Sequence, residues 1–377
     1  MGKSGTRYLN MSVENKPLRL LFVGDIFPAD EDISKGFGIL SKTEDNKKRW
    51  SDNIQAAVGQ ADYIVGNLEG PLLRHPEDKT FCGSPLFAEV LKDAGVNILN
   101  IANNHITEHG AEGVDQTLSI LKEQGILAIG TVQNDSPEFV TIQENDTKIC
   151  LAGFCDNRIC TMGKSECYAG LDARTVTETL ERIKSTKPDI IVFVFHWGNE
   201  YVSFPSLEQR QLAYNLIDNG VHLIVGHHSH VIQPYEQYKN GHIIYSLGNF
   251  CFNDVPSRSL EKGMVAEVTI GDRRILDLNF KGLLVQDMSY RKDLVKPMPD
   301  ALFKKSFTHT NQRYARLCRQ QEHTYLSHYA KIVKRNHRLE MMKMCVGFFI
   351  KALNPCNRYR RMLVSNISQY LRAKYDN

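Results

Sequence analysis

Acidic, amide and histidine side chains recur at the ends of short apolar runs in this chain, where they could bind a metal ion. The six segments are Gly24-Asp25, Gly66-Asn67-Leu68-Glu69, Asn103-Asn104-His105, His196-Trp197-Gly198, Gly226-His227-His228-Ser229-His230 and Leu247-Gly248-Asn249-Phe250. Imidazole combined with carboxylate suits zinc, iron or manganese, whereas an all-oxygen site would suit magnesium or calcium. The pattern therefore predicts a site for a divalent transition-metal ion: zinc, iron or manganese.

Each segment taken alone also has an ordinary structural explanation. Gly24-Asp25 could form a turn, Asn104-His105 could cap a helix, and His196 could be a core histidine. The pair His228 and His230 is more specific, because residues i and i+2 of an extended segment point the same way and can converge on one centre. Six strand ends that each carry a possible ligand favour the metal site over these alternatives.

The apolar runs that precede these segments are predicted to be buried strands alternating with helices. The predicted strands are Leu18–Val23, Tyr63–Val65, Ile98–Ile101, Ile126–Ile129, Phe139–Gln143, Lys148–Phe154, Asp189–Phe195, His222–Val225, His242–Ser246, Val265–Ile270 and Ile275–Phe280. The predicted helices are Lys47–Gly59, Pro85–Ala94, Gly110–Gln124, Ala173–Ser185 and Leu207–Asn219. This alternation favours a layered α/β domain with parallel strand pairing, in which loops at the carboxyl ends of the strands form the ligand site.

The charge of the chain is divided unevenly along its length. Of the 46 Lys and Arg and 43 Asp and Glu residues, residues 300–377 hold 16 and 4, a net charge of +12, which leaves 30 and 39, a net charge of −9, for residues 1–299. Helices are predicted in this basic segment at Ala301–Arg319, Glu322–Leu339, Met341–Leu353 and Arg358–Lys374. The segment could be a lid on the α/β domain or a peripheral contact with an anionic membrane. Nucleic acid is disfavoured, since no nucleic-acid motif accompanies the charge.

Composition and the termini bear on the class and compartment of the protein. A hydrophobic content of 42% with 24% charged residues is typical of a globular protein and excludes a disordered or collagen-like chain. Residues 1–17 contain no apolar stretch of the kind found in secretory signals, and the apolar runs are far shorter than the roughly 20 residues of a membrane helix. The nine cysteines are irregularly spaced, which fits a reducing compartment. We therefore expect a cytoplasmic protein, peripheral to the inner face of the membrane if the basic segment binds lipid.

The ordered motifs GD, NLE, NNH, HWG, GHHSH and SLGNF, spread from Leu18 to Asp254, resemble those of the CapA family, named for poly-γ-glutamate capsule synthesis. That family is similar to the calcineurin-like metallophosphoesterases. The resemblance implies a four-layer αββα sandwich of the metallophosphoesterase type with a basic helical C-terminal extension. The expected divisions are a flexible N-terminus at 1–17, the metallophosphoesterase-like domain at 18–296, and the extension at 297–377.

The resemblance also implies roles for individual residues. The implied metal ligands are Asp25, Glu69, Asn104, His196, His228 and His230, with Glu69 bridging two ions. His105 resembles the histidine that protonates the leaving group, and the residues expected to support the ligands or bind substrate are Asn67, His227 and Asn249. Superfamily relatives carry a histidine two positions after the first aspartate, where this chain has Phe27. The number of ions therefore stays open at one or two.

Two functions follow from the resemblance. The first is a metal-dependent hydrolase of capsule, exopolysaccharide or poly-γ-glutamate biosynthesis, in which a metal-activated water attacks a phosphoester or an amide or ester bond. Its substrate would be a cell-envelope polymer or a phosphorylated precursor. The alternative is a non-catalytic assembly or scaffold factor of a capsular polymer machine, which Phe27 and the basic segment would suit.

Overall fold

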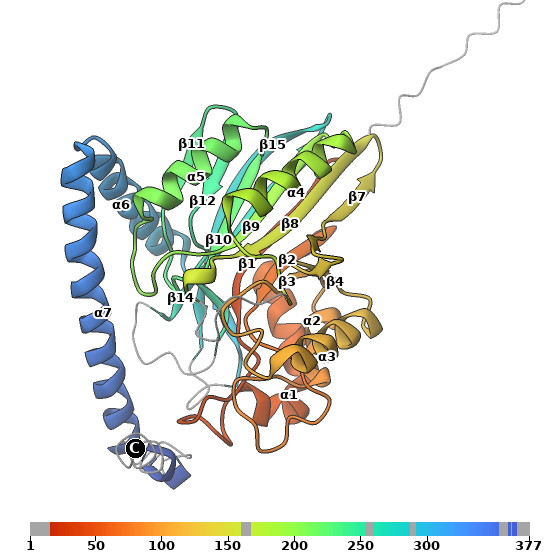
Figure 1. Ribbon diagram of the computed structural model, residues 1–377. Helices are drawn as coiled ribbons and strands as arrows, with labels where there is room; N and C mark the ends of the chain where they lie inside the picture. Colours follow the sequence, from red (N-terminus) through yellow and green to blue (C-terminus); the bar gives the residue numbers. More distant parts are fainter. Residues whose placement is uncertain are drawn as a thin grey trace, which may run out of the picture.

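The computed structural model describes residues 16–159, 167–252, 260–286, 292–353, 361–362 and 364–367. Two β-sheets lie face to face, and helices cover the outer face of each one (Figure 1). Long helices near the C-terminal end lie beside this sandwich.

The first sheet is built around four parallel strands from the N-terminal half of the chain. Its strands are β1 (Leu18–Ile26), β2 (Tyr63–Leu68), β3 (Val96–Asn100), β4 (Leu127–Ile129), β13 (Asn249–Cys251), β14 (Lys262–Gly271), β15 (Arg274–Val285) and β16 (Val295–Pro297). They lie in the order β16-β15-β14-β1-β2-β3-β4, and β13 pairs with the end of β1. Strands β14 to β16 run antiparallel to their neighbours, so the predicted parallel pairing holds for only part of this sheet.

The second sheet has four parallel strands at its centre and an antiparallel strand at each edge. Its strands are β7 (Val140–Glu144), β8 (Thr147–Cys155), β9 (Ile190–His196), β10 (Leu223–His227), β11 (Tyr235–Tyr238) and β12 (Gly241–Ile244). They lie in the order β11-β12-β10-β9-β8-β7. The short strands β5 (Val132–Gln133) and β6 (Ser136–Pro137) form a separate pair, and a single 3₁₀ turn, η1, spans Asn157–Ile159.

Apolar side chains hold the layers together. Phe22 and Val65 from the first sheet pack in one buried cluster with Val192 and Val225 from the second. Helices α1 (Ile39–Val58), α2 (Pro85–Asp93) and α3 (Gly110–Glu123) cover the first sheet, while α4 (Ala173–Ser185) and α5 (Leu207–Asp218) cover the second (Figure 1). Buried on both faces, the central strands need continuous apolar runs, which is the pattern that the sequence carries. The predicted four-layer αββα sandwich is confirmed.

The basic segment begins inside the packed part of the molecule. Helix α6 (Asp300–Cys318) places Phe303 against Gly282 of β15 and buries Tyr314 and Leu317 in the cluster beneath α5. The Tyr314 hydroxyl donates to Glu236 at 2.8 Å. Hydrophobic burial of this kind makes α6 a part of the sandwich's surface layer rather than a free extension.

Helix α7 (Glu322–Leu353) follows α6 after a short turn and runs beside the sandwich as one long helix (Figure 1). Two separate helices were predicted here, Glu322–Leu339 and Met341–Leu353, and that break is wrong. Residues 339–341 include neither proline nor glycine, so nothing in the backbone ends the helix there. The further helix predicted at Arg358–Lys374 lies largely outside the described residues. Among the residues that the structure describes, no helix has the length and apolar character that crossing a membrane requires.

Candidate metal centre

The carboxyl ends of the central strands of both sheets meet at one buried group of polar side chains. Asp25 of β1 accepts hydrogen bonds from Asn67 Nδ2 of β2 at 3.0 Å and from His227 Nδ1 of β10 at 2.9 Å. Its second oxygen, Oδ2, accepts from the backbone N–H of His228 at 3.2 Å. The first sheet and the second are therefore joined at this carboxylate.

The histidines around Asp25 also set its charge state. Burial alone would raise the pKa of Asp25, but the hydrogen bond from His227 and the charges of His227, His230 and His228 outweigh it and hold the pKa below its ordinary value. Asp25 is therefore an ionised carboxylate deep in the protein, which is the state that metal binding requires.

Glu69 is fully buried, and neither carboxylate oxygen has a hydrogen-bond partner. The nearest basic atoms are Nε2 of His230 at 3.6 Å and Nε2 of His196 at 3.8 Å from Oε1. Burial and the negative charges of Asp25, Glu200 and Glu31 raise the pKa of Glu69 well above its ordinary value. A buried carboxylate without partners is costly, and a cation between it and the imidazoles would supply what it lacks.

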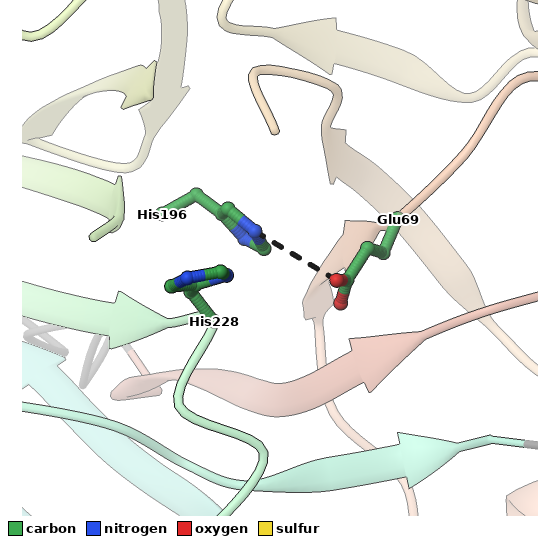
Figure 2. A group of neighbouring side chains, drawn as sticks. All are labelled: Glu69, His196 and His228. Carbon is green, nitrogen blue, oxygen red and sulfur yellow. Dashed lines mark ion pairs between the residues drawn. The ribbon is translucent and has the colours of Figure 1, made fainter. Parts of the chain in front are cut away.

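Two histidines from the second sheet face Glu69, as Figure 2 shows. The rings of His196 and His228 lie 4.8 Å apart between centroids. Burial and the neighbouring imidazoles lower the pKa of His196 well below its ordinary value, and burial lowers the pKa of His228 to about 4. Both rings are thus neutral ligands at neutral pH. Nδ1 of His228 has no hydrogen-bond partner.

Three groups of side chains in this region have the spacing of metal ligands, and two of the three share Glu69. Of these two, one is Asp25, Glu69 and His230, and the other is Glu69, His196 and His228, with the possible ligand atoms of each group within 4.8 Å of one another. Glu69 belongs to both groups, which is the position expected of a carboxylate shared by two ions. The donor set, carboxylate with imidazole, fits a divalent transition metal.

Amide side chains orient these groups. Asn67 Nδ2 also lies 3.2 Å from Nδ1 of His196, and Asn67 Oδ1 accepts from Asn100 Nδ2 at 2.8 Å. Nε2 of His196 faces Oδ1 of Asn104 at 2.7 Å. Asn104 therefore contacts the ring of His196, and Asn67 supports both Asp25 and His196. Asn249 Oδ1 lies 3.0 Å from Nδ1 of His230, so Asn249 supports that ring.

The histidine pair converges for a different reason from the one predicted. Strand β10 ends at His227, and His228 and His230 both adopt left-handed backbone angles, with φ of 85° and 55°. The segment is a tight turn rather than an extended run, so the i and i+2 alternation does not apply. Such angles are unfavourable for residues with a Cβ and are retained where the surrounding structure requires them, often at functional sites.

His105 lies beside the ligand groups at the edge of the buried region. Its Nδ1 is 2.8 Å from Oε1 of Glu108, and its ring stacks on Phe81 with 5.7 Å between centroids. Phe27 contacts His105 edge to face and stacks on Phe252. Phe27 therefore places an apolar ring beside the centre at the position where a histidine was noted as missing.

Two residues that the sequence analysis did not single out also reach the centre. Asn100 of β3 holds Asn67 in place, and Glu200, in the loop after β9, forms a third ligand-like group with His228 and His230. Asn100 ends an apolar run as the predicted residues do, and that signal was available. Glu200 carries only a weak signal, an acidic residue four positions after His196.

Two facing sheets covered by helices, with carboxylate and histidine side chains gathered at their shared edge, define an α/β sandwich with a candidate metal centre. Within that class, the chain belongs to the family of the bacterial capsule synthesis protein PGA_cap, whose family model matches residues 19–254.

Similar proteins carry related names. The capsule biosynthesis protein CapA of Bacillus anthracis is 30% identical over 309 residues, covering 77% of this chain and 72% of that protein. The PGA biosynthesis protein CapA of Bacillus subtilis (strain 168) is 32% identical over 223 residues, 56% of this chain and 59% of that protein. A crystal structure described as a novel phosphatase from Mycoplasma pneumoniae aligns with 14% identity and a TM-score of 0.47, over 78% of this chain and 99% of that one.

Proposed function

We propose that this protein is a metal-dependent hydrolase of capsule or poly-γ-glutamate biosynthesis that cleaves a phosphoester or an amide or ester bond. Its substrate would be a cell-envelope polymer or a phosphorylated precursor. Membership of the capsule synthesis family supports the pathway. The observation that carries the chemistry is Glu69, a buried carboxylate with both oxygens unpaired, shared by two ligand groups.

The residues that would hold the ions are Asp25, Glu69, Asn104, His196, His228 and His230. Manganese is the preferred ion, with zinc and iron as alternatives. A divalent ion held by these residues would lower the pKa of a bound water and polarise the attacked group. Asp25 and Glu69 neutralise positive charge, while Asn67, His227 and Asn249 keep the ligands oriented through their hydrogen bonds.

His105 is the proposed general acid. Oε1 of Glu108 accepts a hydrogen bond from Nδ1 of His105, which leaves Nε2 to deliver a proton to the leaving oxygen or nitrogen. The ring is partly exposed, with 21% of the side chain accessible, so a substrate can reach it. The stack on Phe81 fixes the plane of the ring.

The first test is metal content. The protein is purified without chelator, bound metal is measured by mass spectrometry, and Mn²⁺, Zn²⁺ and Fe²⁺ are titrated into the metal-free form. We expect one or two ions per chain, with loss of binding in Glu69→Ala and His228→Ala. His242→Ala is the matched control, since this half-buried histidine lies at the amino end of β12, away from the centre. Absence of metal from the wild type, or equal binding in all variants, would contradict the proposal.

The second test is turnover. Phosphomonoesters, phosphodiesters and γ-glutamyl amides are offered to the metal-loaded protein and to His105→Ala, which should bind metal normally but lose at least about 10²-fold in rate. Metal binding without turnover on any of the three classes would instead favour the non-catalytic assembly factor.

We also propose a cytoplasmic location with peripheral contact at an anionic membrane or with capsule machinery, through residues 300–377. The exposed basic side chains of α7, Lys331, Lys334, Arg335 and Arg338, support this proposal. Each such residue near an anionic surface contributes up to about 1 kcal/mol. Lys334→Glu/Arg338→Glu should lose sedimentation with phosphatidylglycerol vesicles, whereas Lys92→Glu/Lys122→Glu, on α2 and α3, should retain it. Sedimentation that is independent of salt and of both pairs would contradict the contact.

A further inference from the structure

Glu200 belongs to neither of the two ligand groups that share Glu69, yet it lies beside them. One of its carboxylate oxygens, a ring nitrogen of His228 and a ring nitrogen of His230 all lie within 4.8 Å of one another. These two histidines come one from each of the Glu69 groups. Glu200 therefore approaches the same two imidazoles as Glu69 does.

The backbone holds Glu200 in this position. The N–H of Tyr201, the next residue, donates to the carbonyl of Ser229 at 2.8 Å, which ties the Glu200 loop to the turn between His228 and His230. Tyr201 has a φ of 62°, so the two contacting segments contain three non-glycine residues in left-handed conformations. Strain of this kind persists only where the rest of the structure enforces it. The position of Glu200 is thus built into the fold.

The electrostatics around Glu200 favour a bound cation. With Asp25 and Glu69, Glu200 is the third acidic side chain beside the imidazoles of His228 and His230. One of those imidazoles, His228, is 3% exposed and has an Nδ1 atom with no partner. Buried charge of one sign is stable only when it is paired or coordinates a metal.

Phe27 brings an apolar ring, and no ligand atom, to the side of the centre where His230 lies. The Phe27 ring is buried and contacts Phe81, Phe252 and His105, so this position offers no ligand atom. His230 also packs on Phe252, with 4.9 Å between ring centroids. Phe27 and His230 therefore both pack against Phe252.

We propose that Glu200 is a metal ligand, binding the same ion as His230 and supplying the coordination that residue 27 does not. The proposal rests on the proposed metal-dependent function and adds a carboxylate to it. The ion near His230 is then held by oxygen donors and one or two imidazoles, a set that suits Mn²⁺ or Fe²⁺ better than a nitrogen-rich set would.

The experiment compares Glu200→Gln and Glu200→Ala with Glu31→Gln. Glu31 is a matched control, because its negative charge also acts on Glu69 but it belongs to none of the ligand groups. Metal-free full-length protein of each variant is titrated with Mn²⁺ by calorimetry, and free Mn²⁺ is followed by its electron paramagnetic resonance signal. These readouts do not depend on any substrate.

We expect both Glu200 variants to lose one ion per chain or to bind it at least 100-fold more weakly, while Glu31→Gln changes affinity less than threefold. Circular dichroism and thermal melting of the metal-free variants establish that they fold. If the wild type binds Mn²⁺ and the Glu200 variants bind the same number of ions with unchanged affinity, this proposal is wrong and the proposed function stands. Equal weakening in the Glu31 and Glu200 variants would also overturn it, since Glu200 would then act only through its charge. A wild type that binds no metal overturns both proposals.

Discussion

Replacing Glu69 by glutamine should stabilise the metal-free protein while removing its response to metal. Glu69 is fully buried with no partner for either oxygen, and burial with the nearby negative charges raises its pKa well above the ordinary value of a glutamate. Between pH 4.5 and the raised pKa the folded protein keeps a proton that the unfolded chain has lost. Stability therefore falls as the pH rises, by about 1.4 kcal/mol for each pH unit.

The size of the effect follows from this slope. At pH 7 the loss is at most about 3 kcal/mol, and Glu69→Gln abolishes it because the amide does not titrate. For a domain of this size the gain corresponds to a rise in Tm of roughly 4–5 °C. At pH 4.5 the gain disappears. A metal ion present at 100 times its dissociation constant would instead stabilise the wild type by about 2.7 kcal/mol, and this term is lost in the variant.

Thermal and urea unfolding of both proteins, with EDTA and with Mn²⁺, at pH 5 and pH 7, measure these differences. Glu236→Gln is the control, because Glu236 accepts hydrogen bonds from the hydroxyls of Tyr214, Tyr245 and Tyr314. That substitution should lower stability with or without metal. If Glu69→Gln lowers the stability of the metal-free protein at pH 7, or raises it equally at both pH values, the reasoning is refuted.

Three further substitutions test other parts of the structure. A Cβ at Gly153 would lie 2.0 Å from Oδ1 of Asn100, so Gly153→Ala should lower the free energy of urea unfolding by about 1–3 kcal/mol. Because Asn100 donates a hydrogen bond to Asn67, the same change should displace Asn67 and weaken Mn²⁺ binding. An unchanged Mn²⁺ affinity would count against the positioning role of the amides. Tyr314→Phe keeps the ring and loses the hydroxyl's bonds to a carboxylate and to a second tyrosine, which predicts a loss of about 1–3 kcal/mol; a urea midpoint equal to wild type would show that these bonds add nothing. The pKa of His228 is lowered to about 4 from 6.5, so below pH 6.5 the unfolded chain binds a proton that the folded protein does not. The metal-free protein should therefore lose up to about 3 kcal/mol of folding stability as the pH falls from 6.5 to 4. His228→Gln should flatten this part of the stability profile measured by urea unfolding, and a profile parallel to wild type would disprove the assignment.

The sequence predicted the layers and most of the ligand groups because both depend on local patterns. Apolar runs of four to seven residues identify strands buried on both faces, and parallel strands bring the residues after them to one edge. Asp25, Glu69 and His196 lie together for that reason.

Features fixed by contacts distant in sequence were harder to predict. Strand β13 has only three residues and forms because Asn249 and Cys251 pair with β1. Helix α1 starts at Ile39, well before the predicted Lys47, because the carboxylate of Asp30 holds the backbone N–H groups of Gly36 and Ser41 at its start. No periodic pattern reveals such a bond, since residues 41–49 of α1 are all polar.

Glu200 illustrates the same limit within the site. Its place depends on the hydrogen bond between Tyr201 and Ser229, two segments that are adjacent only in the folded protein. The sequence motif predicted that the rings of His228 and His230 converge. The turn that brings them together uses left-handed backbone angles, which the residue types do not predict.

The packing of α6 means that the change of charge near residue 300 is a poor place to cut the chain. Deletion of residues 300–377 would uncover the apolar surface beneath α5 that Tyr314, Leu317 and Tyr325 cover, and the remainder would aggregate for reasons unrelated to lipid or partner binding. The first turns of α7 also pack on this surface: the Tyr329 hydroxyl accepts a hydrogen bond from Asn199, and Ile332 packs on the same apolar cluster. A deletion that begins after Ile332 keeps the sandwich covered and removes about 30 Å of rod from α7 at 1.5 Å per residue. Shortened versions of this chain should therefore tolerate endings within α7 far better than endings before α6.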